Sequence, residues 1–180
     1  MKSRLLFIGL VIFFCISCQN EIAEIKAVTD DFNYPVQSIL DADYIFSERG
    51  ERTSRLESPL LERFVKDTSI VVARNGFKMT FYDNIEGDAV LTAKTGEFWE
   101  KSGVFKANGN VRMINSDQEY MLSESVIFYR DSDLIKTDDW VTIQTKTGIL
   151  HGKGLISNAA FTEYQILKPT GQMNINNNID

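Results

Sequence analysis

Groups that carry out covalent or metal chemistry are scarce in this chain. His151 is the only histidine, so a zinc or iron site would have to be built from carboxylates alone. The sequence HGKG around it lacks the G-x-x-x-x-G-K-[ST] spacing of a phosphate-binding loop. Two KTG triplets, which start at Lys94 and Lys146, lack the S-x-x-K element that accompanies them in β-lactamase-type enzymes. We therefore expect a protein that is not an enzyme, with no metal and no cofactor.

Carboxylates are abundant, but their spacing does not define a site. Asp131, Asp133, Asp138 and Asp139 do not match the positions of an EF-hand loop and are typical of solvated turns. The paired carboxylates of a glycoside hydrolase come from distant strands, so the sequence leaves that alternative open. Its test is whether a cleft holds two acidic residues within about 10 Å of each other.

Length and charge limit the remaining classes. A chain of 180 residues with 43% hydrophobic and 24% charged residues can bury one good core, which indicates a single folded domain. The 19 Lys and Arg residues against 25 Asp and Glu give a net charge of -6. Nucleic-acid binding needs a clustered basic surface, so we expect no nucleic-acid partner.

The first residues have the pattern of a secretion signal. Lys2 and Arg4 precede an uncharged apolar run from Leu5 to Ser17, which is 13 residues long. Because crossing a bilayer takes about 20 residues, a transmembrane helix is the less favoured alternative. Ser17 before Cys18 resembles a bacterial lipobox, so residues 1–17 are predicted to be a lipoprotein signal peptide and Cys18 the lipid anchor. An ordinary signal peptide with a chance cysteine is a further alternative.

The rest of the chain divides into a tether and a β domain. Residues 18–40 hold too few apolar side chains for a core element and are predicted to be the lipidated N-terminus and a tether. From Asp41 to residue 180 apolar and polar residues alternate, as in Phe77, Met79 and Phe81, with turn signals every 8 to 12 residues or so. This pattern predicts an all-β domain of antiparallel strands, which could be a sandwich, a barrel or a jellyroll.

An internal repeat supports this interpretation. A shift of 30 residues places Phe98 on Phe128, Val111 on Val141 and the turn at residues 101–103 on the turn at residues 131–133. Side chains alternate between the two faces of a strand, so an even shift keeps each residue on the same face. If Phe98 points inward, Phe128 does as well.

The repeated segments resemble a known family. LTAKTGEFW followed by GNVRM, and MLSESVIFY followed by DWVTI, look like the organic-solvent-tolerance (OstA-like) repeats of lipopolysaccharide transport. The order of anchor, tether, ADYIFSERGERTSRLESPLLERF and a final EYQILKPTG resembles the LptC family over roughly residues 41–175. The resemblance implies an open β-jellyroll in residues 41–180, held in the periplasm at the inner membrane.

The same resemblance implies a function without catalysis. Such a domain accepts lipopolysaccharide in an apolar groove from an inner-membrane ABC transporter with a periplasmic jellyroll. It then passes the lipid to a soluble periplasmic bridge protein on the way to the outer membrane. The N-terminal edge, near residues 44–56, is expected to dock the transporter through Tyr44 and Phe46, and the C-terminal edge, near residues 164–175, the bridge protein through Tyr164 and Ile166. The groove candidates are Phe81, Leu91, Phe98, Phe105, Val111, Met113, Phe128, Ile135, Val141, Ile143 and Ile166, for each of which plain core packing is an equal alternative.

A second class of function remains open. The chain could be a glycan-binding or other ligand-binding β-sandwich lipoprotein, in which exposed Trp99 and Trp140 stack on sugars. Two packed sheets with a flat aromatic face would favour this alternative, and one continuous apolar groove would favour lipid transfer.

Overall fold

The domain is built almost entirely from strands. The computed structural model describes residues 34–65 and 68–170, and in this part of the chain eleven antiparallel strands form one continuous sheet. The prediction of an all-β, jellyroll-like domain is therefore confirmed. The strands are β1 (Gln37–Glu48), β2 (Glu51–Val65), β3 (Ser69–Arg74), β4 (Phe77–Phe81), β5 (Ala89–Ala93), β6 (Thr95–Trp99), β7 (Val104–Ile114), β8 (Tyr120–Tyr129), β9 (Leu134–Gln144), β10 (Ile149–Asn158) and β11 (Tyr164–Thr170), with a single 3₁₀ turn at Arg130–Ser132.

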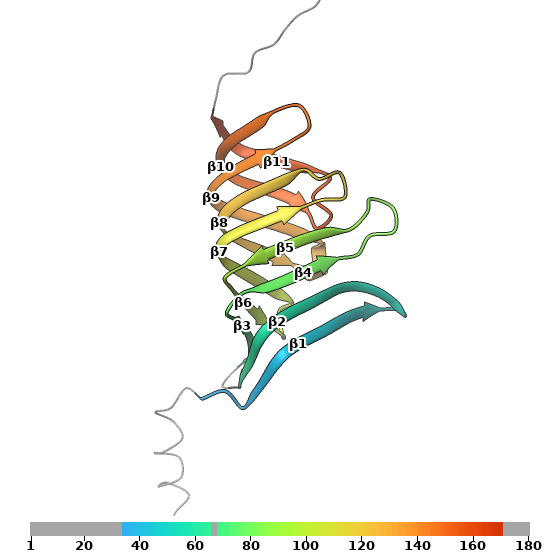
Figure 1. Cartoon of the computed structure of the whole chain (residues 1–180), viewed down its shortest axis with the longest axis vertical. Coiled ribbons are helices and arrows are strands. Elements are labelled where there is room, and N and C mark those ends of the chain that lie inside the picture. The colour runs from blue at the N-terminus through green and yellow to red at the C-terminus, as the bar shows by residue number, and fades with distance from the viewer. Residues whose placement is uncertain (1–33, 66–67, 171–180) are drawn as a thin grey trace, which may run out of the picture. The chain divides into compact units, whose positions relative to one another are not determined.

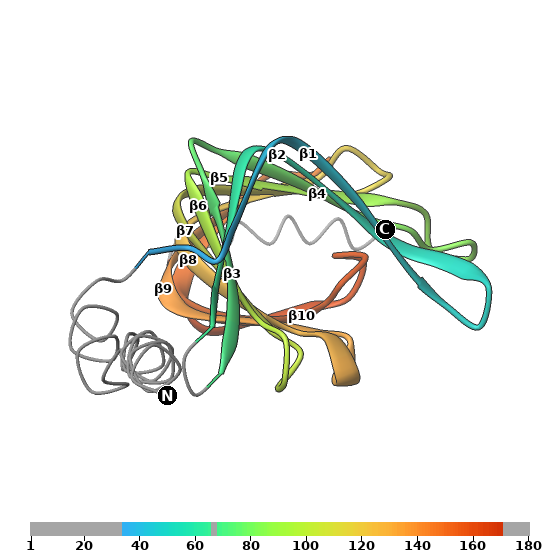
Figure 2. The ribbon, with the colours of Figure 1, turned by 90° about the horizontal axis from the view of Figure 1, so that it is seen from below.

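The strands stack on one another along the long axis of the domain, from β1 at one end to β10 and β11 at the other (Figure 1). The sheet is also folded over, because its long strands change partner part of the way along. In β2, residues 54–57 pair with β4 and residues 60–65 pair with β3. In β7, residues 104–108 pair with β6 and residues 112–114 pair with β5. Two layers result, joined along one side and separate on the other (Figure 2).

The bends follow a regular spacing that explains the sequence repeat. Lys94, Gly109, Glu124, Asp139 and Gly154 lie fifteen residues apart, and the ladders shift register or break at or beside these positions. A bulge bends a strand and increases its twist, so a row of aligned bulges folds a sheet along one line. The thirty-residue period is therefore two antiparallel passes of fifteen residues, each bent once.

Two serine hydroxyls satisfy backbone carbonyls that the bends leave without ladder partners. The Ser58 Oγ lies within hydrogen-bond distance of the carbonyl oxygens of Leu60 and Gly76, at 3.1 Å in each case. The Ser123 Oγ lies 3.2 Å from the carbonyl oxygens of Ser125 and Trp140. Both serines are buried, where an unpaired carbonyl would be costly. The same device is thus used in β2 and in β8.

The sheet ends in two strands that each pair on one side within the described chain. β1 pairs with β2, and β11 pairs with β10. The start of β1 at Gln37 corrects the predicted tether, which extended to residue 40. Ile39 packs against the core and the Val36 amide donates to the Arg63 carbonyl oxygen at 2.7 Å, contacts that sparse apolar spacing does not reveal.

Several predictions fall outside the described residues. These are the signal peptide, the Cys18 anchor, residues 18–33 of the tether and residues 171–175 of the C-terminal edge. In the described ranges there is no helix of the length and hydropathy that a membrane span requires.

Candidate functional site

The groove candidates share the inner face of the folded sheet. Nine of the eleven are buried in a single core cluster, and Phe98 and Ile166 pack against it from partly exposed positions. Phe98 and Phe128 do point to the same face, as the even repeat predicts. The shared face is a finding about geometry, and contact with lipid remains a prediction for each residue.

Cross-strand pairing explains why these side chains meet. In one layer Met79 pairs with Leu91, Leu91 with Met113, Met113 with Met121, and Met121 with Ile143. In the other layer Phe98 pairs with Phe105, Phe105 with Phe128, and Phe128 with Ile135. Directly opposed residues on one face of a sheet lie about 5 Å apart, so each layer presents a continuous apolar row to the interior.

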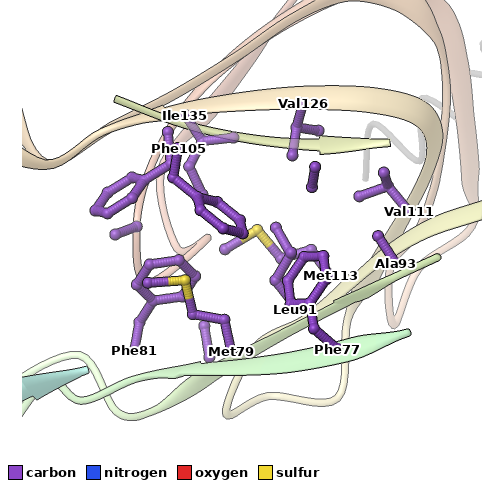
Figure 3. Close-up of a cluster of buried hydrophobic side chains, with 14 of the residues drawn as sticks. Phe77, Met79, Phe81, Leu91, Ala93, Phe105, Val111, Met113, Val126 and Ile135 are labelled. Carbon is purple, nitrogen blue, oxygen red and sulfur yellow. The ribbon is translucent and has the colours of Figure 1, made fainter. Parts of the chain in front are cut away.

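Aromatic rings connect the two rows. Phe81 meets Phe128 edge-to-face with ring centroids 4.8 Å apart, and Phe77 meets Phe105 at 5.2 Å. Figure 3 shows Phe77, Met79 and Phe81 of β4 directed toward Phe105 and Ile135 of the opposite layer. Such pairs add about 0.5–1.5 kcal/mol to their burial. The layers are thus held together through their side chains as well as through the bends.

One part of the interior is tightly packed. We call it the filled region and define it by the fully buried side chains of β7–β10. Val111, Met113, Met121, Ile143 and Leu155 are 0% exposed. The loop between β10 and β11 closes its end.

That loop inserts Phe161, which is fully buried and stacks on Tyr164 with centroids 5.0 Å apart. The Asn115 side-chain amide donates to the Phe161 carbonyl oxygen at 3.0 Å and fixes the loop in place. A lipid would find no space here without displacing packed side chains.

The interior is hollow nearer to β1, in what we call the cavity region. A first cavity of about 380 Å³ lies within the range of small-molecule sites, about 300–1,000 Å³. Its apolar floor comes from both layers, and its mouth is formed by the turns. The lining residues are Phe46, Glu48, Thr53, Ser54, Leu56, Met79, Phe81, Tyr82, Asp83, Phe98, Phe105, Phe128, Arg130, Asp131, Asp133, Ala159 and Ala160.

A second, smaller cavity of about 110 Å³ adjoins the first on the side of β3 and the start of β1. Phe46, Leu56, Phe98 and Phe105 line both cavities and separate them. The lining residues are Gln37, Ile39, Tyr44, Phe46, Leu56, Leu61, Arg63, Val71, Ala73, Phe98, Glu100 and Phe105.

The two cavities divide the groove candidates. Phe81, Phe98, Phe105 and Phe128 line one or both cavities. The other seven line neither, and six of these are among the most buried residues of the core. Sequence alternation could not make this distinction. It predicts which face of the sheet a side chain occupies, but not whether the space next to that side chain is filled by other residues.

Several cavity residues were not singled out from the sequence. Leu56, Met79, Leu61 and Val71 follow the same alternation as the chosen residues and could have been found by it. Phe46 was predicted as an edge residue. It lies on the edge strand β1, yet it points inward, meets Phe98 at 6.2 Å and lines both cavities.

The partner-edge candidates lie on the two terminal strands. Tyr44 and Phe46 are on β1, and Tyr164 and Ile166 are on β11. Tyr44 is partly exposed, whereas Tyr164 and Ile166 pack against the core. Leu56, at the far limit of the predicted N-terminal edge, lies on β2 and is flanked by strands on both sides.

The mouth of the first cavity is acidic. Glu48, Asp83, Asp131 and Asp133 surround it with Arg130 as the one basic lining residue. Desolvation raises the pKa of Asp133, and the charges of Asp83 and Glu86 raise it further against a hydrogen bond from the Ala159 backbone. Acidic residues therefore share this cleft, so the hydrolase alternative is not dismissed by the lack of an acidic cleft.

The aromatic residues of the glycan alternative are separated. Trp99 ends β6, on the outer face of one layer, and is only partly exposed. Trp140 is 62% exposed and follows the bend at Asp139 in β9. The two indoles do not form a shared flat face. Across residues 34–65 and 68–170, no three His, Cys, Asp or Glu side chains are grouped so as to hold a metal ion.

Comparison with known protein families places the chain in context. A family described as "Lipopolysaccharide-assembly, LptC-related" matches residues 4–170, which is nearly the whole chain. No individually curated protein matches the chain.

Proposed function

Because the chain belongs to the LptC-related family of lipopolysaccharide assembly, we propose that its cavity region binds the acyl chains of lipopolysaccharide in transit. The observation that supports this is the hollow, apolar interior beside a region that is otherwise fully packed. Acyl chains bind by burial of CH₂ groups, each contributing about 0.8 kcal/mol. A cavity that opens to solvent holds such chains without enclosing them, which suits a cargo that must leave again.

The lipid passes from an inner-membrane ABC transporter to this domain and from there toward a soluble periplasmic bridge protein. Strands β1 and β11 support this route, because each presents an edge that no strand of the described chain covers. An extended partner strand can add to such an edge through main-chain hydrogen bonds. In this proposal the transporter adds at β1 and the bridge protein at β11.

The domain acts without catalysis and is anchored to the membrane by the acylated Cys18. The lipid anchor is proposed from the short apolar run before Cys18, and the inner membrane is its proposed location. Energy for transfer comes from the transporter, since the chain carries no nucleotide-binding loop motif.

The decisive experiment is site-specific photo-crosslinking in cells. A photoreactive residue at Phe98, which faces both cavities, is expected to capture lipopolysaccharide, and one at the next position, Trp99, is not. The pair is a matched control, because the two residues are adjacent on β6 and point to opposite faces. Equal capture at both positions, or none at Phe98 in a folded protein, would overturn the proposal.

Crosslinking at Val141 then separates the two regions of the interior. Val141 is 2% exposed and lies in the filled region, so we expect much weaker capture there than at Phe98.

A further inference from the structure

An ion pair lines the second cavity. The Arg63 Nη2 donates to both oxygens of Glu100, at 2.6 and 2.5 Å, and the Arg63 Nε donates to the Ser69 Oγ at 3.1 Å. Among the residues that line this cavity, Arg63 and Glu100 are the ones that carry charge at neutral pH. The hydrogen bond from Arg63 lowers the pKa of the Glu100 carboxyl, so the carboxylate stays ionised and the pair stays intact.

The ion pair is accessible from solvent. The side chain of Arg63 is 42% exposed and that of Glu100 is 32% exposed. Ion pairs in this environment contribute little net stability, because water screens the charges and the side chains lose rotamer freedom. A competing anion could therefore replace Glu100 at small cost to the fold.

The two cavities differ in the charge of their lining: the first is acidic and the second carries one positive and one negative side chain. Four carboxylates surround the first cavity, with Arg130 among them, and these repel an anionic group. The second cavity balances one guanidinium against one carboxylate, so rotation of the Glu100 side chain toward solvent would leave the guanidinium as the charge that faces a ligand. A lipid with a phosphorylated headgroup would thus be oriented by the charges at the two ends.

We propose that the second cavity is the headgroup end of the lipid site, and that Arg63 exchanges Glu100 for a phosphate group of the bound lipid. The guanidinium fits a phosphate with two parallel hydrogen bonds, a geometry that a lysine cannot reproduce. The acyl chain then extends past Phe46 and Phe98 into the first cavity, away from the acidic mouth. This inference rests on the proposed function and adds to it the orientation of the lipid and the residue that binds its phosphate group.

The test compares lipids with and without phosphate on the purified full-length chain. Equilibrium binding is measured for lipopolysaccharide and for its enzymatically dephosphorylated form, with the wild type, Glu100→Gln and Arg63→Met. The wild type is expected to prefer the phosphorylated form. Glu100→Gln is expected to strengthen that preference by about tenfold, because it frees one charge-assisted contact. Arg63→Met is expected to abolish the preference, measured as the ratio of the two affinities within that variant.

A second ion pair, which like the first includes a residue of β2, is a matched control. Arg74 pairs with Glu62 across β3 and β2, and neither residue lines a cavity described above. Arg74→Met and Glu62→Gln are expected to leave both affinities unchanged. If the control variants shift the preference as strongly as the Arg63 and Glu100 variants, bulk charge explains the effect and the inference is wrong.

The remaining outcomes also decide the question. A folded Arg63→Met that keeps the preference for phosphorylated lipid would overturn the inference while leaving lipid binding, and so the proposed function, intact. Absence of binding to either lipid would overturn the proposed function itself. Inorganic phosphate is added alone as a competitor. If millimolar phosphate abolishes the preference for the phosphorylated lipid, the site binds free phosphate and is not specific for a lipid headgroup. If Arg63→Met fails to fold, Arg63→Lys keeps the charge, and it should lose most of the preference because it loses the two-point contact.

Discussion

The filled region and the cavity region belong to one continuous sheet that bends at a regular spacing, yet one is packed and the other is hollow. In the filled region, branched and flexible side chains such as Ile143, Met113 and Met121 occupy all the space between the layers. In the cavity region, Phe46, Phe81, Phe98 and Phe128 span the gap with rigid rings that meet edge-to-face. A rigid aromatic ring can bridge a wide gap but leaves irregular space beside it unfilled. A methionine side chain is flexible and can fill such space. The choice of side chain on a common scaffold therefore decides where a ligand has room.

The strands also differ in length between the two regions. β7–β10 are single long strands that cross the bend, whereas β3, β4, β5 and β6 are short and form the rungs in separate pieces. Here the long strands β2 and β7 join the two layers, because each pairs with a short strand of either layer. Of the short strands, β3, β4 and β6 contribute cavity-lining residues, together with the longer strands β1, β2, β7 and β8.

The largest effect that separates the regions is expected from truncation of a core side chain. Ile143→Ala in the filled region should lower the free energy of unfolding by about 3–4 kcal/mol, because packed neighbours cannot collapse into the space. Phe98→Ala should cost about 1–2 kcal/mol despite its larger side chain, since it is already partly exposed beside two cavities. Urea unfolding of both variants measures the difference, and equal losses would contradict the division into two regions.

Enlargement of a small side chain should also lower the free energy of unfolding more in the filled region than in the cavity region, by a smaller difference. Ala107→Leu, at a position that is 0% exposed and lines neither cavity, should destabilise the domain by about 1–3 kcal/mol through overpacking. Ala73 lines the second cavity, so the larger side chain of Ala73→Leu has space to occupy. This variant should lower the free energy of unfolding by less than about 1 kcal/mol and should reduce lipid capture at Phe98. Thermal unfolding and crosslinking are measured on the same samples. A strongly destabilised Ala73→Leu would show that the second cavity is not available space.

The smallest effect concerns the acidic mouth of the first cavity. The raised pKa of Asp133 means that the folded protein holds its proton more tightly than the unfolded chain. Folding stability from this group is therefore lost as the pH rises above the ordinary value of 3.8 and through the raised pKa.

Asp133→Asn should remove this loss and raise stability slightly at neutral pH, with no gain at a pH well below 3.8. The left-handed backbone of Asp133, with φ of 50°, also accepts asparagine without strain. Urea midpoints across the pH range are the measurement, and a gain that is the same at every pH would rule out titration of Asp133 as the cause.

Much of the fold follows from local patterns. The alternation of Phe77, Met79 and Phe81 and the even repeat of Phe98 and Phe128 each predict the correct face, because side chains alternate strictly along a strand. The start of β1 at Gln37 was missed, since an edge strand with mostly exposed side chains has no apolar alternation to signal it.

The sequence by itself determined the β class, the inward face and the repeat, since period and turn signals act over a few residues. Only the tertiary structure decided that Phe81 meets Phe128 across the layers, that four candidates face a cavity while the others are packed, and that Arg63 and Glu100 share the second cavity. These depend on bends at aligned bulges and on pairing between strands far apart in the chain, such as β3 with β6. No local pattern encodes the distance between two layers, and that distance is what separates a core from a binding site.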